Sequence, residues 1–172
     1  ATATLSNAIT NSTTSPQNVI YTVTPTFGGC TGTGQTVTVT VNPTPTMTSA
    51  STATICSGAT VSIPLTSNVG SNFTWIAANN ANTTGESTTV KSTTTINDVV
   101  TNNVSTAEII AYTLIPTTTP QGCVGPDTLI HVTVNPLPQG TFVGNSRCIS
   151  APSQLGYLTW TATAGTNNFT VV

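Results

Sequence analysis

Side chains capable of acid, base or nucleophilic chemistry are scarce in this sequence. Its 172 residues include one histidine, His131, and four carboxylates, Glu86, Asp98, Glu108 and Asp127. General acid–base and covalent catalysis need several such groups brought together in one site. We therefore expect no catalytic residues, no catalytic cofactor and no enzymatic function.

The same residues are poorly spaced for binding a metal ion. His131 has no second histidine or carboxylate at ligand spacing, and no short loop carries the several carboxylates typical of a calcium site. Calcium held by backbone carbonyls and asparagine side chains is the alternative that remains open. We expect no metal site and an exposed His131.

The charge content excludes several classes of partner. The net charge is −2, from two basic and four acidic residues, and there is no basic cluster for nucleic acid or an anionic membrane. No apolar run has the length of a membrane helix. Threonine instead fills 42 positions, and this β-branched residue favours strands while offering a hydroxyl to water.

Apolar and threonine residues alternate in several short segments, the pattern of strands with one buried face. Gly, Pro and Asn clusters separate these segments, as in a β-sandwich. The glycines between Gly28 and Gly34 lack a lysine and a following helix, which indicates a hairpin loop and not a phosphate site. The predicted strands are 19–23, 37–41, 59–65, 73–76, 109–114 and 129–134.

The sequence repeats itself with a period of about 92 residues. Tyr21-Thr-Val-Thr-Pro matches Tyr112-Thr-Leu-Ile-Pro, and Val39-Thr-Val-Asn-Pro matches Val132-Thr-Val-Asn-Pro. Cys30 corresponds to Cys123, Cys56 corresponds to Cys148, and Asn11 corresponds to Asn102. These matches predict tandem sandwiches.

The phase of the repeat predicts three segments. Residues 1–43 are the C-terminal half of a first repeat, 44–136 a complete repeat, and 137–172 the N-terminal part of a third. We expect this to be a window on a longer array, in which missing sequence or another copy covers the apolar faces of the partial repeats. Paired prolines at both joints suit a semi-rigid rod.

A family resemblance rests on Ile55-Cys-Ser-Gly58, Phe73-Thr-Trp75, the Tyr-Thr-x-x-Pro strand, a Gly-Cys pair and the closing Val-Thr-Val-Asn-Pro-x-Pro. These motifs resemble the PKD-like, immunoglobulin-like repeats of large surface and secreted proteins of Bacteroidetes, including gliding-type adhesins. The resemblance covers nearly the whole chain. It implies a seven-stranded sandwich, export by a type IX pathway, and a stalk or adhesive role.

Three aromatic residues are predicted to lie in the core. Trp75 aligns with the position where such sandwiches bury a tryptophan, and Tyr21 and Tyr112 suit buried rings whose hydroxyls bond to the backbone. Asp127-Thr128-Leu129 matches a short O-glycosylation pattern of exported Bacteroidetes proteins, which makes Thr128 a candidate modification site; an ordinary strand start is the alternative.

The cysteines predict a disulfide because exported proteins meet an oxidising environment. Cys56 with Cys123 closes the complete repeat and is the first choice. Strands that alternate in direction would place these two residues at opposite ends of the sandwich, too far apart to bond. The pairing therefore needs residues 52–56 to fold back; otherwise each cysteine pairs with a neighbouring repeat or stays reduced.

The sequence thus predicts an all-β tandem array that serves as a structural stalk or adhesin segment outside the cell. Its expected partners are neighbouring repeats or other copies, and surface glycans or a substratum, with no nucleic acid and no membrane insertion. Two alternatives are a carbohydrate-binding module of an exported glycoside hydrolase, which would expose aromatic residues in a row, and a self-assembling filament completed by strand addition.

Overall fold

The computed structural model describes residues 4–144 and 158–164, and every regular element in these ranges is a β-strand. The all-β prediction is confirmed. The described part of the chain contains no helix long and apolar enough to span a bilayer.

The main sheet of the central sandwich has four strands, in the order β5-β12-β11-β7. The antiparallel ladders join β11 to both β12 and β7, while β5 runs parallel to β12. Every second residue of β11, from Ile110 to Thr118, is buried, as expected for a strand that covers a core. The strands are β5 (Thr52–Cys56), β7 (Ser71–Ala77), β11 (Glu108–Thr118) and β12 (Thr128–Asn135).

The opposite layer is built from short strands joined by longer stretches of bonded backbone. Residues 59–65 run antiparallel to residues 94–100, and the Val61 and Leu65 amides donate to the carbonyls of Asp98 and Thr94. Residues 46–48 bond in turn to residues 66–68. The short strands are β6 (Ile63–Pro64), β8 (Thr83–Thr84), β9 (Thr95–Ile96) and β10 (Thr101–Asn102).

One hydrophobic core lies between the two layers. Trp75 and Tyr112 form its centre, with ring centroids 5.8 Å apart and planes at 63°, an edge-on contact. Both layers contribute aliphatic side chains to it. The other core residues are Val61, Ile63, Leu65, Phe73, Ala77, Ile96, Val100, Ile110, Leu114, Ile130, Val132 and Val134.

A hairpin precedes the sandwich and repeats the geometry of β11–β12. It is formed by β1 (Gln17–Val23) and β4 (Gln35–Val41), with β2 (Thr26–Phe27) and β3 (Cys30–Thr31) at its tip. Tyr21 pairs with Val37 and Val19 with Val39, as the corresponding Tyr112 pairs with Ile130 and Ile110 with Val132. The two hairpins therefore have the same register.

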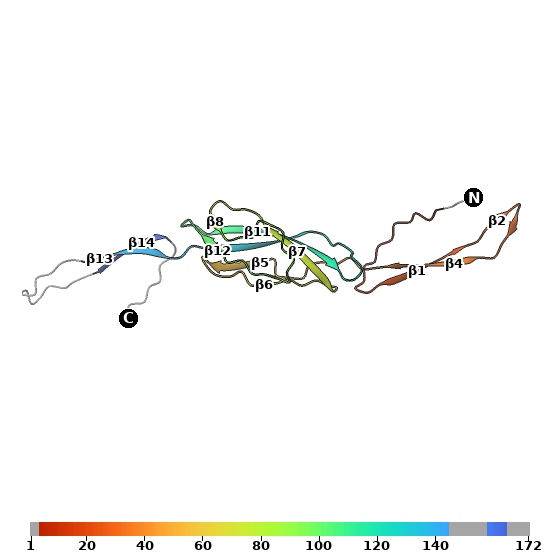
Figure 1. The fold of residues 1–172 in the computed structure, drawn as a ribbon, viewed down its shortest axis with the longest axis horizontal. Coiled ribbons are helices and arrows are strands. Elements are labelled where there is room, and N and C mark those ends of the chain that lie inside the picture. Colours follow the sequence, from red (N-terminus) through yellow and green to blue (C-terminus); the bar gives the residue numbers. More distant parts are fainter. Residues whose placement is uncertain (1–3, 145–157, 165–172) are drawn as a thin grey trace, which may run out of the picture.

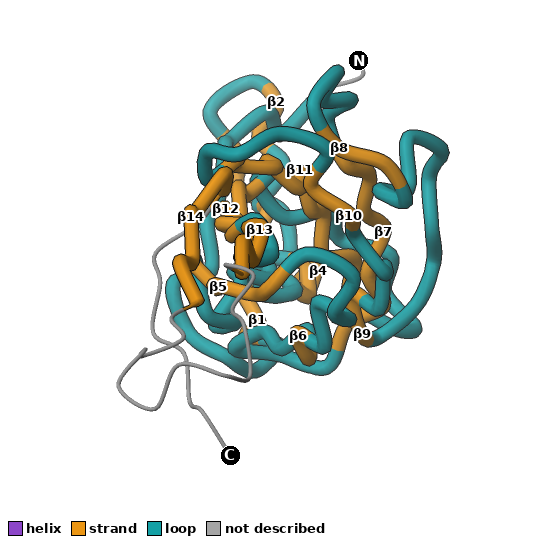
Figure 2. The backbone as a smooth tube through the Cα atoms, turned by 90° about the vertical axis from the view of Figure 1, so that its left-hand side faces the viewer, coloured by secondary structure: helices purple, strands orange, loops and turns teal. Residues whose placement is uncertain are grey.

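A second hairpin, of β13 (Gln139–Gly144) and β14 (Leu158–Ala164), follows the sandwich. Figure 1 shows the molecule as an elongated body, with β1–β4 extending from one end of the sandwich and β13–β14 from the other. Figure 2 looks along this axis and shows the sandwich strands arranged around the interior.

The sequence missed one strand of the main sheet and misplaced one aromatic residue. β5 was not among the predicted strands, although it forms the edge beside β12. Tyr21 was expected in the core but is partly exposed, because no described residues form a second layer over the β1–β4 hairpin as residues 59–65 and 94–100 do over β11–β12.

Candidate functional site

Asn102 is a buried polar residue at the end of the sandwich where the chain leaves it. Its Nδ2 donates to the carbonyls of Thr106 (2.7 Å) and Val134 (2.8 Å), and its Oδ1 accepts from the Val104 amide (2.9 Å). Its backbone amide donates to Ser57 Oγ at 2.9 Å. Asn102 therefore fixes the turn before β11 to the end of β12.

The hairpin before the sandwich contains the same arrangement. Asn11 Nδ2 donates to the carbonyls of Ser15 (2.8 Å) and Val41 (2.7 Å), and Asn11 Oδ1 accepts from the Thr13 amide (2.9 Å). These partners correspond, one for one, to those of Asn102. The asparagine therefore has the same structural role in both places, and the backbone already occupies the hydrogen-bonding groups of its side chain.

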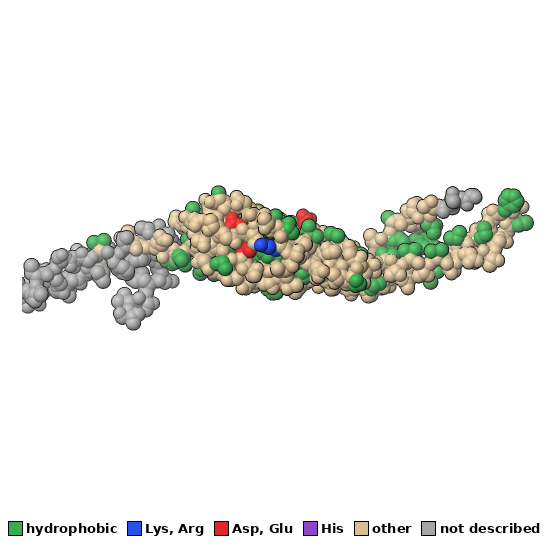
Figure 3. Space-filling view, in the orientation of Figure 1, with side chains coloured by type: hydrophobic (Ala, Val, Ile, Leu, Met, Phe, Trp, Pro, Cys, Tyr) green, Lys and Arg blue, Asp and Glu red, His purple; other side chains and the backbone are tan. Residues whose placement is uncertain are grey.

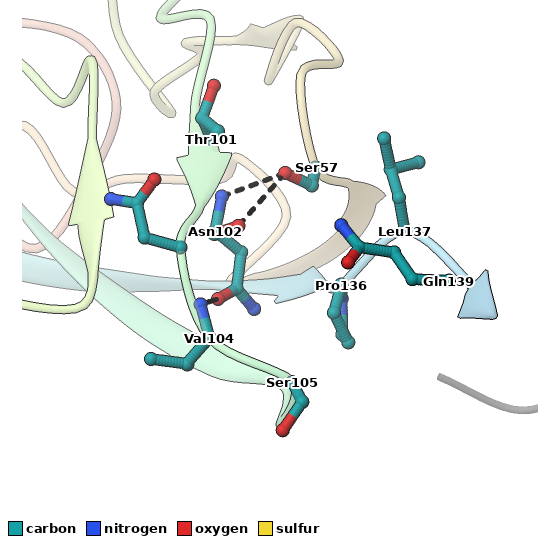
Figure 4. Close-up of a pocket in the computed structure, with 9 residues that line it drawn as sticks. Ser57, Thr101, Asn102, Val104, Ser105, Pro136, Leu137 and Gln139 are labelled. Atoms are coloured by element: carbon teal, nitrogen blue, oxygen red, sulfur yellow. Dashed lines mark hydrogen bonds between the residues drawn. The ribbon is translucent and has the colours of Figure 1, made fainter. Parts of the chain in front are cut away.

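A cavity of about 510 Å³ opens beside Asn102, between the sandwich and the start of β13. Figure 4 shows Ser57 and Asn102 bonded to each other on one side of it, and Pro136, Leu137 and Gln139 on the other. No ionisable side chain lines it, and its two best-placed polar groups are already bonded to each other. The residues that line the cavity thus offer hydroxyl, amide and aliphatic groups.

A second polar group lies inside the sandwich around Asp98. This buried carboxylate accepts from the Ser87 amide (2.7 Å), from Ser87 Oγ (2.6 Å) and from the Tyr112 hydroxyl (3.1 Å). Burial of the phenol, with the negative charge of Asp98 beside it, raises the pKa of Tyr112 far above its usual range. The hydroxyl partner is thus a carboxylate and not the backbone group that we predicted.

Two further carboxylates lie next to this group. Glu86 Oε1 accepts from the Asn80 amide (3.2 Å) and from Thr83 Oγ1 (3.1 Å), while Glu86 Oε2 is buried without a partner. Glu108 Oε2 accepts from Asn80 Nδ2 at 3.0 Å. Within the described ranges, no three His, Cys, Asp or Glu side chains are grouped as metal ligands. The bonds of these carboxylates fix the 80–87 loop against β11.

The joint at the other end of the sandwich is tightly packed. Pro45 is fully buried, and a methyl group added to Gly125 would overlap the Pro45 carbonyl oxygen and crowd Pro116. The loop between β11 and β12 therefore closes directly over the entering chain. Pro138, the counterpart of Pro45 at the exit joint, is exposed because no described residue takes the place of Gly125 there.

Two of the three predicted core aromatics lie in the centre of the sandwich. Trp75 is 2% exposed and Tyr112 is completely buried. The Trp75 indole also donates to Thr93 Oγ1 at 3.0 Å. Neither ring is available for stacking on a ligand.

The structure does not contain the Cys56–Cys123 disulfide. Both thiols are free, as is that of Cys30; Cys148 lies outside the described residues. Cys56 pairs with Asn135 at one end of β12, whereas Cys123 precedes the other end. The eight residues of β12 span over about 20 Å, far beyond the reach of a disulfide. Residues 52–56 do not fold back, because they pair in parallel along β12.

The other candidate residues lie along β12. Thr128 is its first residue and is partly buried, and Asp127 before it is exposed. His131 is exposed, as expected. The structure does not bring these residues together into one site.

The sequence missed the structural roles of Asn102 and Asp98. The correspondence of Asn11 with Asn102 was visible, and a repeated polar residue flanked by apolar positions was the available signal. Asp98 gave no such signal, because its partners Ser87 and Tyr112 are distant in sequence and its counterpart in the first repeat is Asn7.

A comparison with models of known protein families gives a match. The family model described as PKD-like domain matches residues 1–45 and 53–138, about three quarters of the chain. No curated protein matches the sequence. The all-β sandwich and the family match agree, and the chain belongs to the PKD-like domain family.

Proposed function

We propose that this chain is a non-catalytic structural segment, a stalk or adhesin portion, of a large exported bacterial surface protein of the gliding-adhesin type. PKD-like domains are generally non-catalytic, typically occur in extracellular proteins and are compatible with structural or adhesive roles. Its partners are then neighbouring repeats, with glycans or a substratum contacted along the rod.

The observation that carries the proposal is the position of the two joints. The chain enters at Pro45, under the loop between β11 and β12, and leaves after Asn135, at the far end of β12. The entry and exit points thus lie at opposite poles of the sandwich (Figure 1). Domains connected in this way stack end to end into a rod and not side by side.

The parallel pairing of β5 with β12 supports a role under tension. Tension applied at the two poles pulls β5 toward the entry pole and β12 toward the exit pole. Their ladder is then loaded in shear, so its hydrogen bonds must break together. The ladder extends from the His131 amide on the Ser51 carbonyl to the Ser57 amide on the Asn135 carbonyl.

The exposed surface argues against the carbohydrate-binding alternative. Such a module would present several aromatic rings in a row. Among the described side chains, Phe73, Trp75 and Tyr112 are buried, Tyr21 is only partly exposed, and Phe27, at the hairpin tip, has 92% of its surface exposed.

A pair of proline substitutions in β5 tests whether the β5–β12 ladder resists tension applied between the poles. In a parallel ladder alternate residues make the bonds, and Ser51 and Ser57 set the bonded series, which includes Ala53 and excludes Thr54. Ala53→Pro removes a ladder donor and should cost about 1–3 kcal/mol of stability and lower the force at which the sandwich unfolds. Thr54→Pro, one residue away, should change both quantities much less.

Single-molecule force spectroscopy with the chain held by its two ends gives the measurement. Equal unfolding forces for the wild-type protein and the Ala53→Pro variant, despite a measured loss of stability, would show that the β5–β12 ladder does not bear the load. The proposal would then lose its mechanical basis.

A further inference from the structure

The main sheet of the central sandwich has one covered edge and one open edge. Along β7, the Trp75 amide and carbonyl both bond to Lys91, and the Ala77 amide donates to the Ser87 carbonyl at 2.8 Å. Among the described residues, none pairs with the outer edge of β5. Figure 1 shows β5 along the side of the sandwich, between its two poles. The open edge therefore lies on the flank of the rod.

Three residues of β5 direct their backbone groups toward this open side. Alternate residues bond to β12 in the parallel ladder, so Thr52, Thr54 and Cys56 present their amides and carbonyls in the opposite direction. All three residues are exposed. Within the described ranges, the only backbone bond to this outer row is from the Ala59 amide to the Cys56 carbonyl, at 3.0 Å. A row of unpaired backbone groups is a template for another strand.

The sequence of this edge does not oppose the approach of another strand. Natural sheet edges are often protected by charged side chains, prolines or bulges. Residues 44–85, which include β5, contain no charged residue, and β5 itself contains no proline and pairs with β12 without a bulge. Figure 3 shows how few charged side chains the visible surface carries. The flanking residues are small, which leaves room for a second backbone; they are Ala50, Ser51, Ser57 and Gly58.

The same edge of a second copy has the complementary pattern of backbone groups. Two β5 strands that run antiparallel and are centred on Thr54 place Thr52 of each copy opposite Cys56 of the other. All three outward residues are then paired, and each pair exchanges two hydrogen bonds. Thr54 faces Thr54 of the second copy, a cross-strand pair that stabilises antiparallel sheets. Because the edge is uncharged, two copies bring no like charges together along it.

We propose that the open edge of β5 is the docking surface for β5 of a second copy of this chain, so that the main sheets of two sandwiches join into one continuous sheet. The interface is isologous, with a two-fold axis at Thr54, and therefore closes as a dimer. Because it lies on the flank, it joins rods side by side and leaves both poles free. This partner goes beyond the structural role proposed above, and a monomeric chain would leave that role intact.

Two substitutions of Thr54 test the assignment. Thr54→Pro removes the outward amide at the centre of the interface and leaves the bonds between β5 and β12 in place. It should raise the dissociation constant of the dimer by at least about tenfold, since each dimer loses two hydrogen bonds. Thr54→Val is the matched control, because it keeps the amide and the β-branched shape. It should change the dissociation constant by less than about threefold.

A cysteine at position 52 tests the register of the pairing. Thr52→Cys places a thiol opposite the native Cys56 of the second copy, with Cα atoms about 5.5 Å apart, within the range of a disulfide. The same two positions within one chain are about 13 Å apart along the strand, too far to bond. Mild oxidation should therefore give a covalent dimer linked from residue 52 to residue 56. Thr88→Cys, exposed in the loop beside the covered edge, should not link to Cys56.

Sedimentation velocity over about 1–500 μM measures the association, a range suited to a small interface. The wild-type protein should show a monomer–dimer equilibrium. A monomer at the highest concentration, association that Thr54→Pro leaves unchanged, or loss of association in Thr54→Val would overturn the proposal. An unchanged unfolding transition in both variants shows that the sandwich is intact. If Thr54→Pro unfolds it, the cross-link decides, and absence of the link between residues 52 and 56 overturns the proposal.

Discussion

At the scale of single residues, two polar side chains organise an otherwise apolar sandwich. Asn102 bonds the turn before β11 to the end of β12, and Asp98 accepts hydrogen bonds from Ser87 and Tyr112 inside the sandwich. Buried polar groups of this kind are costly when unpaired, so their complete bonding favours one arrangement of the loops. The Asp98 carboxylate and the Tyr112 hydroxyl thus serve the structure of the sandwich.

Tyr112 should make the stability of the sandwich sensitive to strongly alkaline pH. Its pKa is raised in the folded state, so the folded protein keeps the phenol proton while the unfolded chain loses it above about pH 10. The resulting stabilisation is fully present below pH 10 and should decline by about 1.4 kcal/mol per pH unit above it.

The Tyr112→Phe variant separates this effect from other alkaline titrations. Loss of the hydroxyl should cost about 1–2 kcal/mol at neutral pH, through the lost bond to Asp98. Urea unfolding at pH 8 to 11 should then show the stabilities of the two proteins converging. Parallel curves over this range would contradict the buried-phenol explanation.

The cysteines should remain unlinked within one sandwich. Cys56 is exposed near the exit joint and Cys123 lies in the loop near the entry joint, at opposite ends of β12. Peptide mapping without reduction should recover them in separate peptides, and a thiol reagent should label Cys56 in the folded protein. A peptide linking Cys56 to Cys123 would mean that β5 does not pair with β12 as described.

At the scale of elements, local alternation predicted most strands but not how they pair. The segments around Tyr21, Val39, Tyr112 and Val132 were identified because apolar residues occupy every second position, most regularly in β4, where threonine and valine alternate. β5 was missed because it has five residues, and its partner, β12, lies far along the chain. The failed disulfide prediction has the same origin, since parallel pairing is a non-local property.

The candidate site residues show the same difference between local sequence signals and contacts with distant segments. The aromatic residues Trp75 and Tyr112 could be assigned from type and spacing alone. The local sequence around Tyr21 is similar to that around Tyr112. Whether the ring is buried, however, depends on covering strands that are distant in sequence. Asp98 could not be assigned, because its bonding depends on the folded 80–87 loop.

The contact between the β11–β12 loop and the entry joint should not tolerate a larger residue. Gly125→Ala places a methyl group against the Pro45 carbonyl oxygen and the Pro116 ring, and should destabilise the sandwich by about 1–3 kcal/mol. Gly70→Ala, where the added methyl would meet open space, should have an effect within about 0.5 kcal/mol. Thermal or urea unfolding compares the two, and equal effects would mean that the joint is not packed as described.

At the scale of the whole molecule, the chain enters the central sandwich at one pole and leaves it at the opposite pole. At the entry pole, Pro45 packs under the β11–β12 loop. At the exit pole, β12 ends at Asn135. The hairpins beyond each pole lie along the same axis (Figure 1). This geometry supports the structural role proposed above.

The most direct test of this account compares two directions of pulling on the central sandwich. Handles at the two chain ends load the parallel β5–β12 ladder in shear. Handles at Ser105 and Leu137, both exposed at the exit pole, instead peel β12 from β11 one residue pair at a time, starting at Glu108 and Val134. Single-molecule force spectroscopy should find a clearly higher unfolding force, in one cooperative event, when the chain is pulled by its ends. An unfolding force no higher than that of peeling would contradict the claim that the sandwich is built to bear tension from pole to pole.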